Sequence, residues 1–173
     1  MKSNFETWFD QVDLNIVRWL ARYSLTLLRV GMGIVFLWFG VLKFFPGLSP
    51  ATDLAVRTIT TLTFGLIPPN ISLFLLATLE SAIGLGLLTG KFMRLILALL
   101  AFQMAGTLTP LLLFPQEAFM RFPYAPTLEG QYIIKNMVLI GAGLVIGASV
   151  RNGWIVADPG DFEQQLASQA GKR

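Results

Sequence analysis

Four long apolar runs constrain the fold of this chain more than any other feature. They cover about residues 23–45, 71–89, 92–114 and 132–150, and each is bounded by proline, glycine or charged residues. A helix of roughly 20 apolar residues is long enough to cross a hydrocarbon core about 30 Å thick. Because lipid offers no water to an unpaired backbone, each run is expected to be a helix. The sequence therefore predicts an all-α membrane protein, a four-transmembrane-helix bundle.

Composition excludes several kinds of function. Of the 173 residues, 54% are hydrophobic and 13% are charged, which is typical of one integral membrane domain. The chain contains neither cysteine nor histidine, so thiol redox chemistry, iron–sulfur clusters and the usual haem and zinc ligands are excluded. We therefore predict no metal site and no catalytic residue, and we expect a non-enzyme more than an enzyme. No nucleic-acid partner is expected.

Segments outside the four runs complete the predicted organisation. Residues 1–22 are expected to form an amphipathic helix in the membrane interface. Its apolar positions recur at helical spacing: Phe5, Trp8, Phe9, Val12, Ile16, Trp19 and Leu20. A short extracytoplasmic helix is expected between spans one and two, from about Ser49 to Thr63. Residues 23–150 form the transmembrane domain, and residues 151–173 form a polar cytoplasmic tail.

Basic residues next to the spans predict the orientation in the bilayer. Lysine and arginine are enriched in cytoplasmic loops. They are concentrated in the N-terminal segment, in the tail, and between spans two and three, where Lys91 and Arg94 lie. The other two loops carry only Arg57 and Arg121. We therefore expect a multi-pass protein of a bacterial inner membrane with both termini in the cytoplasm.

A single carboxylate interrupts the second run. Glu80 lies near its middle, where an ionised carboxylate costs several kcal/mol unless it is paired, protonated or hydrated. Polar side chains on the other runs are candidate partners because long basic side chains can reach along a helix. We expect a charged cluster at the bundle centre, formed by Arg29, Glu80, Gln103 and Lys135. The full set of candidate ligand-binding residues is Arg29, Lys43, Glu80, Gln103, Lys135 and Asn136.

Each candidate also has a plainer explanation. Arg29 and Lys43 lie near enough to the ends of their span to extend their charges to the headgroups. Lys135 can mark the outer boundary of the last span, and Gln103 can hydrogen-bond between helices without touching a ligand. Glu80 can form a structural ion pair with no further role. The sequence leaves these alternatives open.

Glycines on the helix faces predict where the spans pack closely. A glycine lets another helix backbone approach, as in contacts between small residues four positions apart. Gly33 and Gly40 share a face of the first span, and Gly84 lies on the face of the second span that carries Glu80. Together with Gly143 on the fourth span, these glycines are the expected helix-packing positions.

The motifs in this order resemble the DoxX-like superfamily of small four-helix membrane proteins. LRVGMGIVFLWFGVLKF (residues 28–44) resembles its first helix, and LESAIGLGLLTG (residues 79–90) resembles its second. The segments TLTPLLLFPQEAF, FPY and EGQYIIKNMVLIGAG are similar to the YkgB-type inner-membrane branch. That branch commonly has Lys-Asp where this chain has Lys135-Asn136. The resemblance covers about residues 23–150.

The resemblance implies an inner-membrane protein, linked in some members to oxidative stress and to quinone-reducing or superoxide-handling partners. Together with the polar residues, it favours a non-catalytic protein that binds a small amphipathic ligand, a quinone or a lipid, or that docks a redox-protein partner. One alternative is a small proton- or ion-coupled transporter or channel using Glu80, for which a homodimer is expected. Another is a scaffold subunit of a membrane complex. No cofactor is predicted beyond a candidate quinone.

Overall fold

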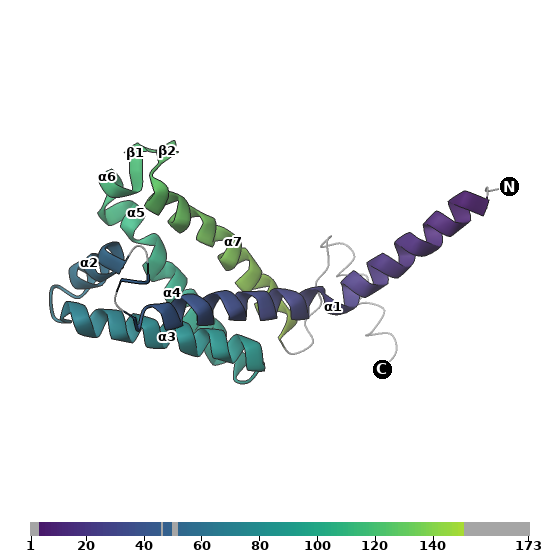
Figure 1. The fold of residues 1–173 in the computed structure, drawn as a ribbon, viewed down its shortest axis with the longest axis horizontal. Coiled ribbons are helices and arrows are strands. Elements are labelled where there is room, and N and C mark those ends of the chain that lie inside the picture. Colours follow the sequence, from purple (N-terminus) through teal and green to yellow (C-terminus); the bar gives the residue numbers. More distant parts are fainter. Residues whose placement is uncertain (1–3, 46, 50–51, 151–173) are drawn as a thin grey trace, which may run out of the picture.

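The computed structural model describes residues 4–45, 47–49 and 52–150, and it is almost entirely helical (Figure 1). The predicted cytoplasmic tail, residues 151–173, lies outside the described residues. The elements in chain order are α1 (Asn4–Leu42), α2 (Thr52–Leu62), α3 (Pro69–Thr89), α4 (Met93–Leu108), α5 (Pro110–Leu113), α6 (Pro115–Ala118), β1 (Phe119–Arg121), β2 (Ala125–Pro126) and α7 (Leu128–Ser149).

Four helical segments are long and apolar enough to cross a membrane. They are Gln11–Leu42, Pro69–Thr89, Met93–Leu113 and Leu128–Ser149. The predicted all-α fold with four spans is therefore confirmed. The short elements α2, α5, α6 and the antiparallel pair β1–β2 gather at one end of the bundle (Figure 1). The C-terminal ends of α3 and α7 lie toward the opposite end.

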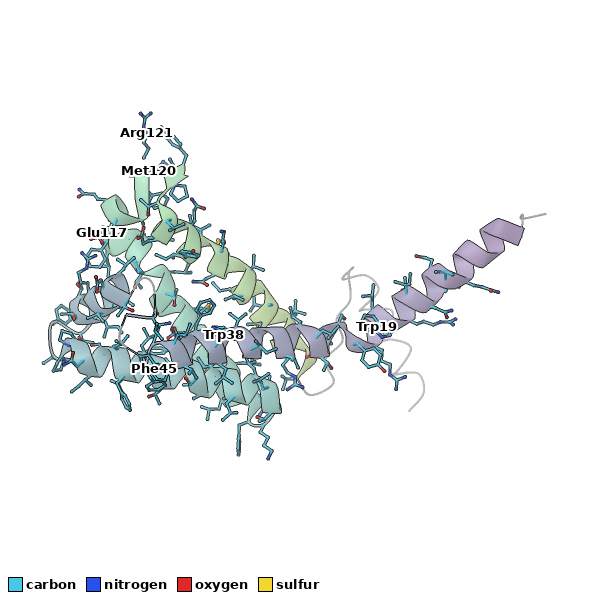
Figure 2. The ribbon with its side chains drawn as sticks, in the orientation of Figure 1. Trp19, Trp38, Phe45, Glu117, Met120 and Arg121 are labelled. Carbon is cyan, nitrogen blue, oxygen red and sulfur yellow. The ribbon has the colours of Figure 1, made fainter. Side chains whose placement is uncertain are left out.

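The first helix differs from the sequence prediction. The interfacial segment and the first span were expected to be separate elements meeting near residue 22, but α1 runs without a break from Asn4 to Leu42. The reason is that no glycine or proline occurs between residues 4 and 30, so nothing interrupts the helix. Its N-terminal part projects beyond the other helices and carries Trp19 (Figure 2). An interfacial position for residues 1–22 stays a prediction.

The most extensive helix contact is between α1 and α3, and glycines make its close approach possible. A Cβ added to Gly40 would lie 2.6 Å from the backbone nitrogen of Ser81, and one added to Gly33 would lie 2.8 Å from Cγ of Leu88. A Cβ on Gly84 would overlap the backbone of Leu37. The two helices are antiparallel, with Gly40 beside Ser81. The fourth glycine, Gly143 on α7, faces a Cδ atom of Leu100 on α4, 3.0 Å from an added Cβ.

The contact also sets an axial offset between α1 and α3. Gly40 lies beside the middle of α3, so α1 ends at Leu42 while α3 extends a further 11 residues toward Pro69, about 16 Å by helical rise. Helix α2 packs against this part of α3 and buries Leu54 and Thr58. At the end of the bundle nearest α2, the space beside α3 is therefore occupied by α2 and not by α1.

The third span is interrupted at Pro110. Proline has no backbone N–H and cannot bond the carbonyl of Gly106, four residues earlier. That carbonyl instead accepts hydrogen bonds from the Thr109 hydroxyl at 2.6 Å and from the Thr109 backbone N–H at 3.2 Å. The span consequently consists of α4 and α5 joined at Thr109.

Candidate functional site

Glu80 is held by two side chains from neighbouring helices. The ammonium nitrogen of Lys43 lies 2.6 Å from Oε2 of Glu80, and the amide nitrogen of Gln103 donates to Oε1 at 3.0 Å. We call Lys43, Glu80 and Gln103 the polar trio. The trio joins the end of α1, the middle of α3 and the middle of α4.

The polar trio is largely shielded from solvent. The side chains of Lys43 and Glu80 are 13% and 12% exposed, and Gln103 is 7% exposed overall. An ion pair in such a position gains its stability only when both partners are present and the remaining polar atoms are bonded. Gln103 meets part of this need because it donates a hydrogen bond to Oε1 of Glu80, whereas Lys43 pairs with Oε2. The positive charge of Lys43 also lies near the C-terminal end of α1, 3.4 Å from the carbonyl of Phe39, where a cation is favoured.

The prediction that Arg29 pairs with Glu80 is wrong. Arg29 donates to the carbonyl of Leu87 at 2.6 Å and approaches that of Leu88 at 3.4 Å, so it satisfies carbonyls at the C-terminal end of α3. The offset between α1 and α3 explains this. Gly40 lies at the level of Glu80, and Arg29 is 11 residues earlier, roughly 16 Å along the helix.

The prediction for Lys135 is also wrong. Its side chain is exposed, and its ammonium lies 5.8 Å from the centre of the Tyr132 ring rather than at Glu80. The expected cluster of Arg29, Glu80, Gln103 and Lys135 therefore does not form, because α7 turns Lys135 away from α3. The cation that pairs with Glu80 is Lys43. The plainer explanation of Lys43, a side chain extended toward the headgroups, is therefore not the one that the structure shows.

A mainly apolar cavity of about 860 Å³ adjoins the polar trio, and all three trio residues line it. Its walls come from α1, α2, α3, α4 and α7. Apolar side chains dominate the lining, with Phe36, Phe39, Leu79, Met104 and Ile133 among them. Asn136 also lines this cavity, half-buried, whereas Arg29 and Lys135 do not. A cavity of this size with a few converging polar groups is typical of a small-molecule site.

The apolar cavity is closed on one side and open on another. Beyond the trio, the four spans pack into a core made of Met32, Phe36, Ile83, Leu87, Ile96, Leu100, Met104 and Ile146. On the outside of the bundle, Phe39, Phe102 and Tyr132 line the cavity yet are 47%, 70% and 51% exposed. The cavity thus reaches the outer surface of the spans, where lipid would lie.

A second cavity, of about 730 Å³, lies beside the first and is more polar. It is lined by Asp53, Arg57, Glu117 and Glu129, and it shares Lys43, Ser49, Leu54 and Glu129 with the apolar cavity. Arg57 on α2 forms a two-bond ion pair with Glu117 on α6, which lies near the hairpin residues Met120 and Arg121 (Figure 2). The hydrogen bonds that Arg57 donates to the Glu117 carboxylate raise the pKa of Arg57 above its usual value. The two cavities meet at Lys43.

Sequence reasoning missed the contribution of α2. Leu54 and Thr58 are 6% and 4% exposed, and both line the apolar cavity. Their spacing of four residues, continued by Leu62, marks one face of α2 as its packing face, but it does not show which part of the bundle that face covers. Within the described residues, no group of three acidic, histidine or cysteine side chains is placed to hold a metal ion.

Comparison with known proteins gives one match. A family model described as DoxX matches residues 24–114, which include α2, α3, the whole third span and the part of the first span from residue 24 onward. No curated protein and no solved structure matches the chain. The matched region contains all three residues of the polar trio.

Proposed function

The chain belongs to the DoxX family of membrane proteins, and we propose that it binds a small amphipathic molecule, a quinone or a lipid, in the apolar cavity. The observation that carries this proposal is the position of the polar trio in the wall of an otherwise apolar cavity. A polar head can bond to the trio while an apolar body contacts side chains such as Phe36 and Leu79. The exposed lining residues support entry from the bilayer.

The shape of the cavity favours binding over conduction. A channel or transporter using Glu80 needs a route past it in both directions. Among the described residues, those lining the cavity extend from the trio toward α2, while the other side is filled by the apolar core around Ile83 and Leu87. A cavity that opens only toward the lipid side can hold a ligand but provides no route past Glu80, so ligand binding is the function that the arrangement supports best.

Filling the cavity tests this proposal. Gly106 lines the cavity, and a Cβ added there meets no heavy atom within 4 Å, so Gly106→Phe places a ring in open space. Gly141 on α7 is equally open but does not line the cavity, which makes Gly141→Phe the matched control. We expect Gly106→Phe to weaken binding of decylubiquinone and of monooleoylglycerol at least tenfold, measured by titration of the purified full-length protein in dodecyl maltoside.

Equal affinities of the two variants for both probes would contradict the proposal. Native mass spectrometry of the same preparations reports any co-purifying molecule, partner protein and copy number together. It therefore also checks the predictions of a redox-protein partner and of a homodimer. The link to oxidative stress stays a prediction from the family resemblance.

We also propose that the protein lies in a bacterial inner membrane with both termini in the cytoplasm. Lys91 in the turn between α3 and α4 and Arg94 in the first turn of α4 support this, since that turn lies at the end of the bundle opposite α2 and the hairpin (Figure 1). Green fluorescent protein fused after Arg173 is expected to fluoresce, and alkaline phosphatase at the same position to be inactive. Active alkaline phosphatase at that position would show that the C-terminus lies outside the cytoplasm and would contradict the proposed orientation.

A further inference from the structure

The charges that line the apolar cavity from inside the bundle cancel. Lys43 and Glu80 form an ion pair at 2.6 Å, and Gln103 is uncharged. Among the described residues of the lining, the remaining one that is charged at neutral pH is Glu129, an exposed carboxylate in the first turn of α7. The polar trio therefore has no net charge to offer a ligand.

The polar trio and Asn136 still have unused hydrogen-bonding groups. An ammonium has three N–H donors, of which Lys43 directs one to Glu80 and one weakly to the carbonyl of Phe39. Gln103 uses one N–H for Glu80 and keeps its other N–H and its carbonyl oxygen. Among the described residues, the Asn136 amide makes no side-chain hydrogen bond, although it is half-buried and lines the cavity. Donors and acceptors are thus both present.

Building on the proposed binding of an amphipathic molecule, we propose that the cavity selects a ligand with an uncharged head group that forms hydrogen bonds with the polar trio. An anionic head would have to separate Lys43 from Glu80 or remain unpaired beside that carboxylate. A cationic head would meet the same difficulty at Lys43. Burying an unpaired charge costs far more than burying a hydroxyl or carbonyl group that is hydrogen-bonded.

Three probes with the same oleyl chain test this selectivity. Monooleoylglycerol is neutral, oleate is an anion and oleylamine is a cation at about pH 8. We expect the full-length protein in dodecyl maltoside to bind monooleoylglycerol at least tenfold more tightly than either charged probe. Equal or tighter binding of a charged probe would overturn the selectivity but leave the proposed binding function intact. Failure of all three probes and of decylubiquinone to bind would overturn both.

Changing the charge of the trio provides the second test. Glu80→Gln leaves Lys43 unpaired, so preference should shift at least tenfold toward oleate, and Lys43→Met should shift it toward oleylamine. Lys135→Met removes one positive charge, as Lys43→Met does, but outside the cavity, and it should keep the preference for monooleoylglycerol. Unchanged ranking in both trio variants would show that the pair does not set selectivity.

Discussion

Replacing Lys43 with methionine is expected to lower the free energy of unfolding by about 3 kcal/mol, because it leaves the shielded carboxylate of Glu80 without its cation. Gln103 alone cannot compensate, since its amide carries no charge. The loss is measurable by titrating the protein in dodecyl maltoside with sodium dodecyl sulfate and following tryptophan fluorescence. Lys135→Met is the control, because Lys135 is exposed and its ammonium lies over the ring of Tyr132, away from Glu80.

A double variant separates the ion pair from other effects of the substitution. Replacing both partners, as in Lys43→Met with Glu80→Leu, leaves no unpaired charge and should recover most of the lost stability. Greater loss in the double variant than in Lys43→Met would contradict this account. So would equal stability of Lys43→Met and Lys135→Met.

The second large effect concerns the contact between α1 and α3. Gly84→Ala adds a Cβ where the backbone of Leu37 already lies, so the helices must move apart. We expect the free energy of unfolding to fall by about 2–3 kcal/mol. This value is at the upper end of the range for overpacking, because the neighbour is backbone rather than a flexible side chain. Separation would also move Lys43 away from Glu80, so the effect should extend to ligand binding. The same detergent titration measures it.

Gly141→Ala is the matched control for this prediction. It makes the same substitution in another span, where the added Cβ meets nothing within 4 Å. Because alanine favours a helix by about 1 kcal/mol over glycine, this variant should be as stable as the parent or slightly more stable. Equal stability of Gly84→Ala and Gly141→Ala would show that the close approach of α1 and α3 contributes little.

Part of the candidate site could be predicted from single helices. Glu80 was identifiable because a carboxylate in the middle of an apolar span must have a partner. Gln103 was identifiable as the polar residue at mid-depth of another span. Both expectations depend only on position along one helix, which residue counting gives directly. The wall formed by α2 was missed because an amphipathic helix of 11 residues does not reveal which face of the bundle it covers.

The four spans follow from the sequence alone, and so does the requirement that Glu80 be paired, protonated or hydrated. Both follow from the cost of exposing polar groups to lipid, which acts on each segment separately. The identity of the partner, Lys43 and not Arg29 or Lys135, follows from the packing of the helices. That choice depends on the axial offset and rotation of neighbouring helices, which the close contacts at Gly40 and Gly84 set. The axial offset is a property of two packed helices, so the residue pattern of one helix alone cannot predict it.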